Sequence, residues 1–205
     1  MCCRSWGDCW MSKLGEVCEI LNGYAFQSQK YVSEGIRVIR ITNVQKGYIE
    51  DKDPKFYPIE LSDELSKYML ESGDLLLSLT GNVGRSAVLT TEYLPAALNQ
   101  RVACLRIKNK RILKSFLFYV LNSDSFEQKC IMAANGIAQK NLSTEWLKEF
   151  EIPDVSLSKQ QEITATLDKI THTIDLCNSI LEKLDLLVKS QKVEQMFVSS
   201  EEVAA

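Results

Sequence analysis

The chain has 205 residues, with 27 acidic against 24 basic side chains and a formal net charge of -3, so it is not a generally basic nucleic-acid-binding protein. With 45% hydrophobic residues it has an ordinary globular composition, which excludes wholesale disorder. Its length suits one complete core plus an appendage rather than two complete domains.

Cysteine usage and the apolar runs indicate the compartment. Seven cysteines at irregular spacing, no Cys-x-x-Cys pair and a single histidine disfavour both a disulfide framework and a zinc site. The longest apolar runs are far too short to span a bilayer, and the N-terminus lacks the apolar stretch of a signal peptide. We therefore expect a cytoplasmic protein in the reducing interior of a bacterium or archaeon.

Two regions follow one another along the chain, with a boundary near Pro153. Before it, Gly, Asn and Pro punctuate short β-like runs, whereas after it there is neither Gly nor Pro. Five runs in the first region have strand length and are rich in β-branched and aliphatic residues, which predicts a sheet. They are Val17 to Ile20, Ile36 to Ile41, Leu75 to Leu79, Ala87 to Thr90 and Val102 to Ile107.

The first region also carries turn and helix signals. Gly81, Asn82 and Gly84 predict the tight turn of a hairpin, because these residue types tolerate a positive φ. The apolar spacing over residues 112–134 is helical, and Asn122-Ser123-Asp124 offers a break and a new N-cap. Strands and helices together predict a mixed α/β (α+β) body over residues 12–153.

The second region is predicted to be one long helix over residues 158–197, with Ser158 and Gln161 in capping-box spacing at its start. Its apolar residues step alternately by four and three, as the a and d positions of a coiled coil do. We call the following residues the heptad seam: Ile163, Leu167, Ile170, Ile174, Cys177, Leu181, Leu184 and Val188.

The length of this helix predicts a partner. About 40 residues at 1.5 Å each give a rod of roughly 60 Å, longer than a domain of this size needs for its own core. We expect the partner helix to come from another copy or from another protein. The alternative is an amphipathic helix folded back on the body, because Leu176, Ile180 and Leu187 widen the apolar face.

Charge and polar clusters point to nucleic acid. Residues 85–148 carry a formal charge of +6 and residues 149–205 carry -6; the basic segment is either a phosphate-binding face or chance clustering. Arg pairs with guanine, and Asn or Gln with adenine, so amide and guanidinium groups at strand ends suit DNA readout, although they also occupy turns. Such clusters are Arg40 to Asn43, Thr80 to Asn82 with Arg85, Asn99 to Arg101, and Gln139 to Asn141.

Catalytic constellations are sparse. A Ser-His-Asp or Cys-His site would need His172, which lies on the predicted rod, where we expect no pocket. Asp53-Pro54-Lys55-Phe56 half-matches an amino-methyltransferase loop and the end of a metal-dependent nuclease site, but Lys55 stands where the first needs a second Pro. We interpret this stretch as a solvated acidic turn and predict a protein that is not an enzyme and holds no metal.

Taken in order, several stretches resemble the specificity subunit of type I restriction-modification systems. Gly136 to Ser143 is the most specific of them. The resemblance covers about residues 13–197 and includes Lys13 to Ile20 with Asn22 to Phe26, Ile39 to Val44, Gly73 to Ser78 with Gly81, Asn99 to Val102, Gly136 to Ser143, Phe150 to Pro153 and Gln160 to Ile163. Ile152-Pro153-Asp154 departs from the family by lacking further prolines, and Met1 to Met11 has no counterpart.

The resemblance implies a DNA-reading target recognition domain at residues 12–153 and, at residues 158–197, a helical spacer that dimerises and docks methyltransferase subunits. In the family, two recognition domains each read one half of a bipartite target, and two long antiparallel helices hold them apart. This chain has one of each. The resemblance therefore implies a half-subunit that homodimerises through the heptad seam and reads an inverted repeat, with a fragment of a longer subunit as the alternative.

By the same resemblance, the chain uses no cofactor and performs no bond chemistry. It directs methyltransferase subunits, which use S-adenosylmethionine, and any restriction subunit, which uses ATP, to double-stranded DNA. We predict these DNA contacts: Arg40, Asn43, Asn82, Arg85, Gln100, Arg101, Gln139, Lys140 and Asn141. The competing interpretation is a coiled-coil adaptor whose α/β head binds a protein or a small ligand.

Overall fold

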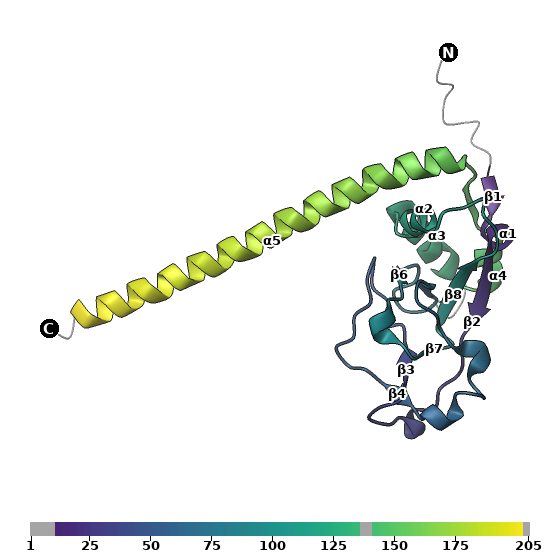
Figure 1. Ribbon diagram of the computed structural model, residues 1–205, viewed down its shortest axis with the longest axis horizontal. Coiled ribbons are helices and arrows are strands. Elements are labelled where there is room, and N and C mark those ends of the chain that lie inside the picture. The colour runs from purple at the N-terminus through teal and green to yellow at the C-terminus, as the bar shows by residue number, and fades with distance from the viewer. Residues whose placement is uncertain (1–10, 136–140, 203–205) are drawn as a thin grey trace, which may run out of the picture. The chain divides into compact units, whose positions relative to one another are not determined.

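The computed structural model describes residues 11–135 and 141–202 (Figure 1). The chain divides into two compact units, the first ending at Gln161 and the second beginning at Glu162. The predicted functional limits, 12–153 and 158–197, remain predictions. The strands are β1 (Met11–Lys13), β2 (Cys18–Asn22), β3 (Ile36–Ile39), β4 (Phe56–Tyr57), β5 (Leu75–Ser78), β6 (Ser86–Val88), β7 (Ala96–Leu98), β8 (Val102–Ile107) and β9 (Glu151–Pro153). The α-helices are α1 (Leu14–Val17), α2 (Lys114–Leu121), α3 (Asp124–Asn135), α4 (Thr144–Glu149) and α5 (Leu157–Glu202).

Among the described residues, the strands of the first unit form three sheets. β2, β8, β5 and β6 pair antiparallel in that order. β4, β3 and β7 form a second sheet, in which β3 and β7 are parallel, and β1 pairs with β9. In the first unit, the four-stranded sheet lies between helices α2 and α3 and the sheet of β3, β4 and β7 (Figure 1).

Each predicted strand is present, with its ends shifted by at most two residues. The expectation of one sheet is wrong, because Ile36–Ile39 belongs to a different sheet from the other four runs. Its partners β4 and β7 have two and three residues, too few to show a periodicity. The helical stretch breaks at Asn122 and Ser123, as predicted. The mixed α/β class with a long C-terminal helix is therefore confirmed.

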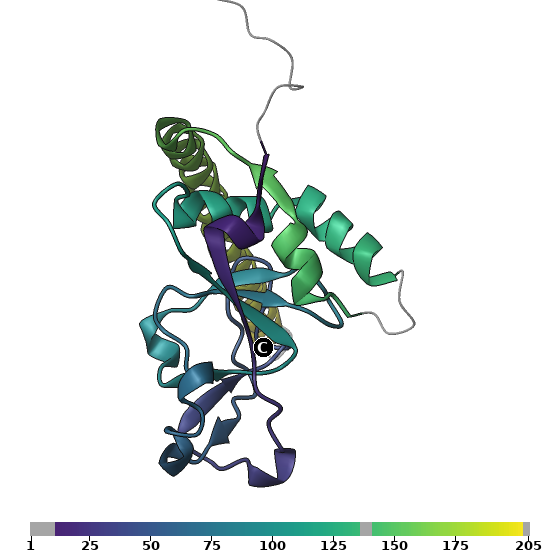
Figure 2. The same ribbon diagram turned by 90° about the vertical axis from the view of Figure 1, so that its right-hand side faces the viewer.

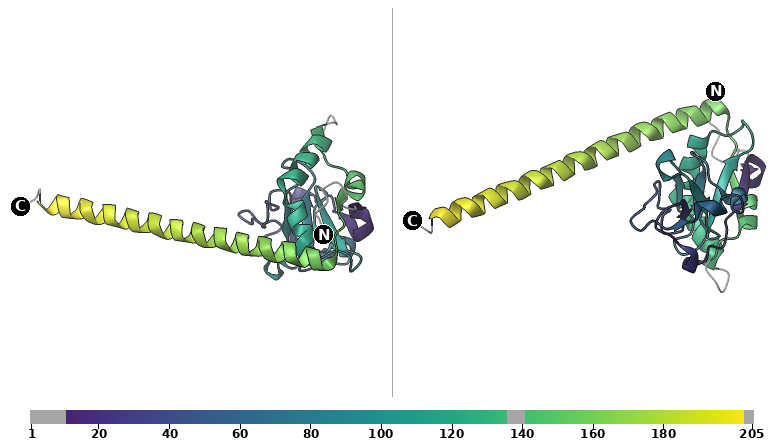
Figure 3. Two further views of the ribbon diagram at one scale, coloured as in Figure 1. Left: turned by 90° about the horizontal axis from the view of Figure 1, so that it is seen from above. Right: turned by 60° about the horizontal axis from the view of Figure 1, so that its bottom comes forward.

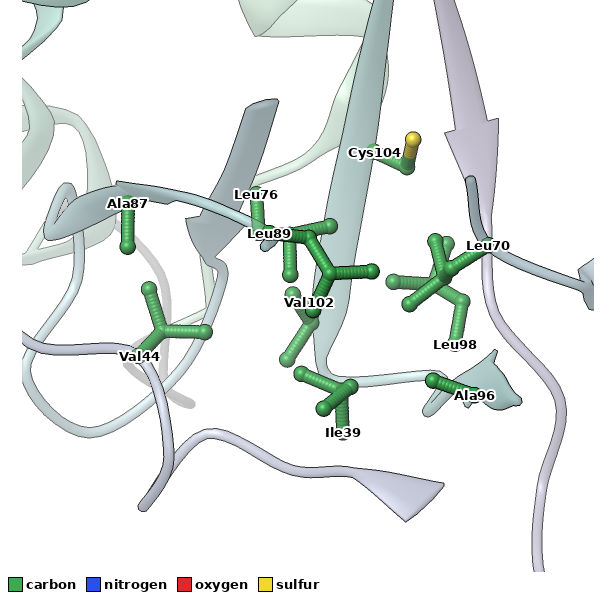
Figure 4. Close-up of a cluster of buried hydrophobic side chains, with 10 residues drawn as sticks. All are labelled: Ile39, Val44, Leu70, Leu76, Ala87, Leu89, Ala96, Leu98, Val102 and Cys104. Carbon is green, nitrogen blue, oxygen red and sulfur yellow. The ribbon is translucent and has the colours of Figure 1, made fainter. Parts of the chain in front are cut away.

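The main core of the first unit joins the four-stranded and three-stranded sheets. Figure 4 shows its side chains, which come from both sheets and from the segments between them: Ile39, Val44, Leu70, Leu76, Ala87, Leu89, Ala96, Leu98, Val102 and Cys104. Full burial of one Leu or Val side chain is worth roughly 1.5–3 kcal/mol. β5 and the first four residues of β8 are buried throughout, and Leu76, Val102 and Cys104 contribute to this core, so its burial fixes one sheet against the other.

The two ends of the first unit meet in the small sheet of β1 and β9, which lie side by side near α4 (Figure 2). Ser12 lies opposite Ile152, and its hydroxyl donates to the Asp154 carboxylate at 2.8 Å. Arg111 donates to the same carboxylate at 2.5 Å. The segment Ile152-Pro153-Asp154 therefore anchors the chain immediately before α5.

α5 is one uninterrupted helix (Figure 3). Its N-cap is Ser156, whose hydroxyl accepts from the Lys159 backbone N–H at 3.3 Å. The capping box expected at Ser158 is wrong, because Ser158 already lies inside the helix. No helix among the described residues is both long enough and apolar enough to cross a bilayer.

Gln160 fixes the first turn of α5 within the first unit. Its side chain is 1% exposed and accepts from the Leu113 N–H at 2.8 Å. Its amide nitrogen donates to the carbonyls of Arg111 and Val155, each at 2.8 Å. One buried amide therefore satisfies three backbone groups in the segments that precede α2 and α5.

Candidate nucleic-acid interface

Described residues from three of the four predicted clusters come together beside the β5–β6 hairpin. The Leu79 N–H donates to the Arg101 carbonyl at 2.9 Å, and the Leu142 N–H donates to the Leu79 carbonyl at 2.8 Å. Thr80 and Asn141 form an isolated β-bridge. An open hollow of about 630 Å³ lies here, lined by Ile41, Leu79, Thr80, Gly81, Gln100, Arg101, Asn141 and Leu142. We call it the hairpin hollow.

Two glycines and a buried serine fix the conformation of the β5–β6 turn. Gly81 has φ +67° and Gly84 has φ +82°, so both adopt the left-handed conformation that the sequence predicted for this turn. A Cβ on Gly84 would lie 2.8 Å from the Cys130 Cβ of α3. Buried Ser78 completes the turn, since its hydroxyl donates to the Asn82 carbonyl at 2.5 Å and accepts from the Arg85 N–H at 3.1 Å. The turn is therefore rigid and presents Asn82 at the surface.

Arg85 leaves this turn with its guanidinium held from two sides. Its Nη1 donates to the side-chain carbonyl of Gln45. The Asn82 side-chain oxygen, in the amide orientation that suits both groups, accepts from both Nη atoms at 3.2 Å. The sequence did not predict a role for Gln45. The only feature that could have indicated one was its position in a short polar loop before Gly47, and such loops are common.

The 99–101 cluster is held by the segment after β2. Tyr24 donates its N–H to the Leu98 carbonyl at 2.8 Å and accepts from the Gln100 N–H at 2.9 Å. Asn99 turns the chain by accepting from the Arg101 N–H at 3.1 Å. A Cβ on Gly23 would lie 2.2 Å from the Asn99 carbonyl, so only glycine fits there. The side chains of Gln100 and Arg101 are exposed beside the hairpin hollow.

The cluster Arg40 to Asn43 mainly stabilises its own loop. Asn43 is 3% exposed, its side-chain oxygen accepts from the Arg40 N–H at 2.9 Å, and its amide donates to the Glu50 carbonyl at 2.8 Å. The Arg40 guanidinium donates to the Asp53 carbonyl. This geometry favours a scaffold role for Asn43, whereas its contact with DNA stays a prediction.

Of the three predicted contacts in the last cluster, the structure describes one. Asn141 is exposed at the hairpin hollow. Gln139 and Lys140 lie outside the described residues. The nine predicted DNA contacts therefore include five exposed or half-exposed groups near one turn, namely Asn82, Arg85, Gln100, Arg101 and Asn141.

Asp53-Pro54-Lys55 has the geometry of a surface turn. The Asp53 carboxylate is 67% exposed and lies 2.6 Å from the Lys55 ammonium. The hydrogen bond from Lys55 lowers the pKa of Asp53, so the group is a stronger acid than usual. A general base working near neutral pH has its pKa raised instead.

Asp74, in the quoted Gly73 to Ser78 stretch, is buried and forms a two-pronged ion pair with Arg106, at 2.9 Å and 2.8 Å. It also accepts from the Glu71 N–H at 2.8 Å. Burial alone would raise the pKa of Asp74, but the Arg106 hydrogen bonds, the Glu71 N–H and the charge of Arg106 outweigh burial and lower it. The pair is a structural link between β5 and β8.

The three cysteines that the structure describes in the first unit are packing residues. Cys18, Cys104 and Cys130 are free and buried. Burial raises the pKa of Cys18 and of Cys130 to about 12, and that of Cys104 in the same direction. The three side chains are therefore neutral thiols without nucleophilic character at neutral pH.

The heptad seam is exposed along most of its length. The exposed fractions of Ile170, Ile174, Leu181, Leu184 and Val188 range from 51% to 59%. Cys177 is exposed as well, and Ile163 and Leu167 are half-buried. Exposed contiguous apolar surface of this kind marks an interaction site. The coiled-coil pairing itself stays a prediction.

A known family matches most of the chain. Residues 8–186 match the model of the type I restriction modification DNA specificity domain. The chain belongs to this family. The resemblance drawn from the sequence motifs is thereby confirmed.

Relatives of this specificity domain come from a bacterium and an archaeon. It is 30% identical over 192 residues to the type I restriction enzyme EcoAI specificity subunit of Escherichia coli. It is 29% identical over 177 residues to the MjaVIII specificity subunit of Methanocaldococcus jannaschii. The matches cover 91% and 84% of this chain but 31% and 42% of those proteins. The chain thus spans well under half the length of these relatives.

Solved structures support the fold. The HsdS subunit from Thermoanaerobacter tengcongensis has a TM-score of 0.61 at 20% identity, covering 84% of this chain and 40% of that one. The type I S subunit from M. genitalium has a TM-score of 0.57 at 16% identity, with 88% and 44% covered. The specificity domain therefore has the same mixed α/β fold with a long helix.

Proposed function

We propose that this chain is the sequence-specific DNA-binding element of a type I restriction-modification complex. One observation carries the proposal. Within a family of DNA specificity domains, polar residues from three distant segments converge on the turn and hollow of the β5–β6 hairpin. Rigid display of Arg, Asn and Gln side chains is what base reading requires, because their donors and acceptors match the edges of guanine and adenine.

The proposed mechanism separates positioning from reading. The basic segment 85–148 attracts the phosphate backbone, whereas Asn82, Arg85 and Gln100 reach base edges from the rigid turn. The chain itself breaks and forms no bond and uses no cofactor. Methyltransferase subunits supply S-adenosylmethionine chemistry, and any restriction subunit supplies ATP-driven cleavage, in the cytoplasm of a bacterium or archaeon.

A second copy of this chain is the proposed occupant of the heptad seam. The seam is symmetric about a point between Ile174 and Cys177, so an antiparallel pair places each a position opposite a d position. Ile174 then faces Cys177 of the second copy, Ile170 faces Leu181, and the outer layers follow. Two recognition domains on one antiparallel pair would read an inverted repeat with a spacer.

The antiparallel register has a direct test by oxidative cross-linking, with Cys2, Cys3 and Cys9 changed to Ser. The Ile174→Cys variant cross-links in an antiparallel pair, whereas wild type and Ile174→Cys with Cys177→Ala do not. A parallel pair places each cysteine opposite itself, so all three proteins would cross-link. No cross-link in any of them, or cross-links in all three, overturns the antiparallel homodimer.

The acidic segment from residue 149 onward is the proposed docking surface for methyltransferase subunits. It carries a formal charge of -6, and Asp175, Glu182 and Asp185 are exposed on α5. Neutral replacement of these three carboxylates, as Asp→Asn and Glu→Gln, is expected to weaken methyltransferase binding in a pull-down at low salt. Unchanged binding contradicts this part of the proposal.

Selection from a pool of randomised DNA duplexes tests the function as a whole. The chain together with its methyltransferase is expected to enrich a two-part inverted motif. Enrichment of a single half-site supports a fragment of a longer subunit, in which a different recognition domain reads the other half. Enrichment of no sequence overturns the DNA-reading function and leaves a protein-interaction adaptor.

A further inference from the structure

Arg85 and Arg101 are presented differently, although both lie beside the β5–β6 hairpin. The Arg101 side chain is exposed, and within the described residues it makes no hydrogen bond. The Arg85 side chain is half-buried, and Gln45 and Asn82 hold its guanidinium. Gln45 lies 40 residues before Arg85 and belongs to none of the predicted clusters.

Gln45 is itself fixed by its own loop. Its amide nitrogen donates to the Thr42 carbonyl at 2.9 Å, which turns the side-chain oxygen toward Arg85. Its backbone N–H donates to the Tyr48 carbonyl at 3.0 Å, and Val44 and Ile49 form a β-bridge, so residues 44–49 make a closed hairpin.

That hairpin, which we call the 44–49 hairpin, is tied to two further elements. The Gly47 N–H donates to the Ser86 carbonyl at 2.8 Å, next to Arg85. The Lys46 ammonium lies 2.6 Å from Asp124 and 2.9 Å from Glu127, both on α3. Gln45 thus contacts Arg85 from a hairpin that is itself bonded to β6 and to α3.

We propose that Gln45 is a positioning residue that orients the Arg85 guanidinium as a fixed fork for a guanine edge. A guanidinium has five N–H donors; Gln45 takes one and Asn82 takes two. Two donors remain, the number that a bidentate contact with O6 and N7 of guanine uses. A fixed fork loses less conformational entropy on binding than a mobile side chain does, and it discriminates between bases. This inference rests on the proposed function, and it adds a residue and a ligand chemistry.

The first measurement needs no DNA. In the full chain, rotation of the Arg85 guanidinium about its Nε–Cζ bond is read from its ¹⁵N side-chain signals, assigned with Arg85→Ala. Rotation is expected to be slow in wild type and in the control Gln29→Ala, an exposed glutamine of the 3₁₀ helix Ser28–Lys30, and faster in Gln45→Ala. Equal rates in wild type and Gln45→Ala overturn the inference.

The second measurement uses a randomised duplex pool, with the chain and its methyltransferase. Arg85→Ala is expected to reduce discrimination at one guanine position by about 10-fold to 100-fold. Gln45→Ala reduces discrimination at the same position by a smaller factor, and the double variant matches Arg85→Ala alone. A merely structural role would lower affinity on all sequences equally, which counts against the inference.

The outcomes separate the inference from the proposed function. If wild type selects a motif but Gln45→Ala keeps the same preference at every position, Gln45 does not position Arg85 for reading, and the DNA-reading function stands. If wild type selects no sequence, the proposed function fails and the reading role of Arg85 fails with it. The NMR comparison then still decides whether Gln45 orients the guanidinium.

Discussion

The two units of the chain differ most in where their apolar side chains lie. In the first unit, Leu76 is completely buried and Leu98 is 1% exposed. In the second, Leu181, Leu186 and Leu187 are 59%, 65% and 60% exposed. The first unit closes its core with contacts between distant segments, such as β2 with β8. A single helix has no second surface of its own to pack against.

The comparison indicates two sources of stability. The first unit gains its own from buried side chains and from polar groups paired inside it, so its stability is independent of protein concentration. The helix beyond Glu162 gains little from burial within its own unit, and most helical stability in proteins comes from packing of an apolar face. Its stability is therefore expected to depend on a partner and on concentration.

The largest expected effect comes from placing charges on the heptad seam. Leu181→Asp with Leu184→Asp is expected to weaken self-association by more than about 100-fold, because each chain would bury two carboxylates, four in all, in the helix pair. Sedimentation equilibrium measures the change. Leu186→Asp, an exposed residue of α5 outside the seam, is the matched control and should leave the dimer intact. Equal association of the two variants contradicts self-association through the heptad seam.

In the first unit, the strongest expected effect is loss of the Asp74–Arg106 pair. Asp74→Ala removes the carboxylate that accepts from Arg106 at 2.9 Å and 2.8 Å. The change removes two charge-assisted hydrogen bonds and leaves the half-buried Arg106 with only the Glu71 carboxylate at 3.4 Å and the Met69 carbonyl at 3.1 Å, so the free energy of unfolding should fall by about 3 kcal/mol. Urea unfolding at pH 7 measures it. The oligomeric state should not change, since Asp74 is remote in sequence from the seam.

The same pair predicts an acid dependence of stability. The folded pKa of Asp74 is lowered, so its contribution is fully present above the unfolded value of about 3.9. The contribution is lost as pH falls through the lower folded value. The loss of stability between pH 7 and pH 3 should therefore be smaller in Asp74→Asn than in wild type. An equal loss in both proteins contradicts the lowered pKa.

Gln160→Leu tests how the first turn of α5 is fixed. The change removes three hydrogen bonds, each of 2.8 Å, and leaves buried backbone groups without partners. The expected cost is about 2 kcal/mol in thermal or urea unfolding of the first unit. Gln161→Leu, on the exposed neighbour, is expected to change stability by less than about 0.5 kcal/mol. A similar loss of unfolding free energy in the two variants would falsify the role given to the Gln160 hydrogen bonds.

The smallest expected effect is at a helix cap. Ser143 accepts from the Trp146 N–H at 3.1 Å, so Ser143→Ala should lower the free energy of unfolding by about 1 kcal/mol. Thr173 donates to the Lys169 carbonyl at 2.8 Å on the exposed surface of α5. Thr173→Ala should change the free energy of unfolding by less than about 0.5 kcal/mol. Tryptophan fluorescence during urea unfolding compares the two variants.

Local sequence signals predicted the parts whose geometry is local. The runs at Leu75 to Leu79 and Val102 to Ile107 are strands, and Gly81 and Gly84 do turn the chain with positive φ. The strands β4 and β7 escaped prediction because they are too short for any periodicity and are defined by their partner β3. The N-cap at Ser156 was missed because Ser158 and Gln161 offered the same spacing two residues later.

The candidate site was predicted in pieces but not as a whole. Arg85 and Gln100 were selected for their side-chain chemistry, and both are available near the hairpin. Asn43 was selected for the same reason, yet it is buried, with its amide bonded to its own loop. Gln45 was passed over, although its side chain holds Arg85. Residue type shows what a side chain can bind, whereas burial and neighbours decide what it does bind.

The sequence by itself determined the family, the mixed α/β class, the long helix and the heptad seam, because periodicity and motif order are properties of neighbouring residues. Only the tertiary structure decided that the hairpin turn, the 99–101 segment and Asn141 surround one hollow, and that Gln45 meets Arg85. These contacts join residues about 20 to 60 positions apart, and no local signal encodes which distant segments close on each other. The common core of the two sheets brings them together, because burying its apolar side chains is what fixes one sheet against the other.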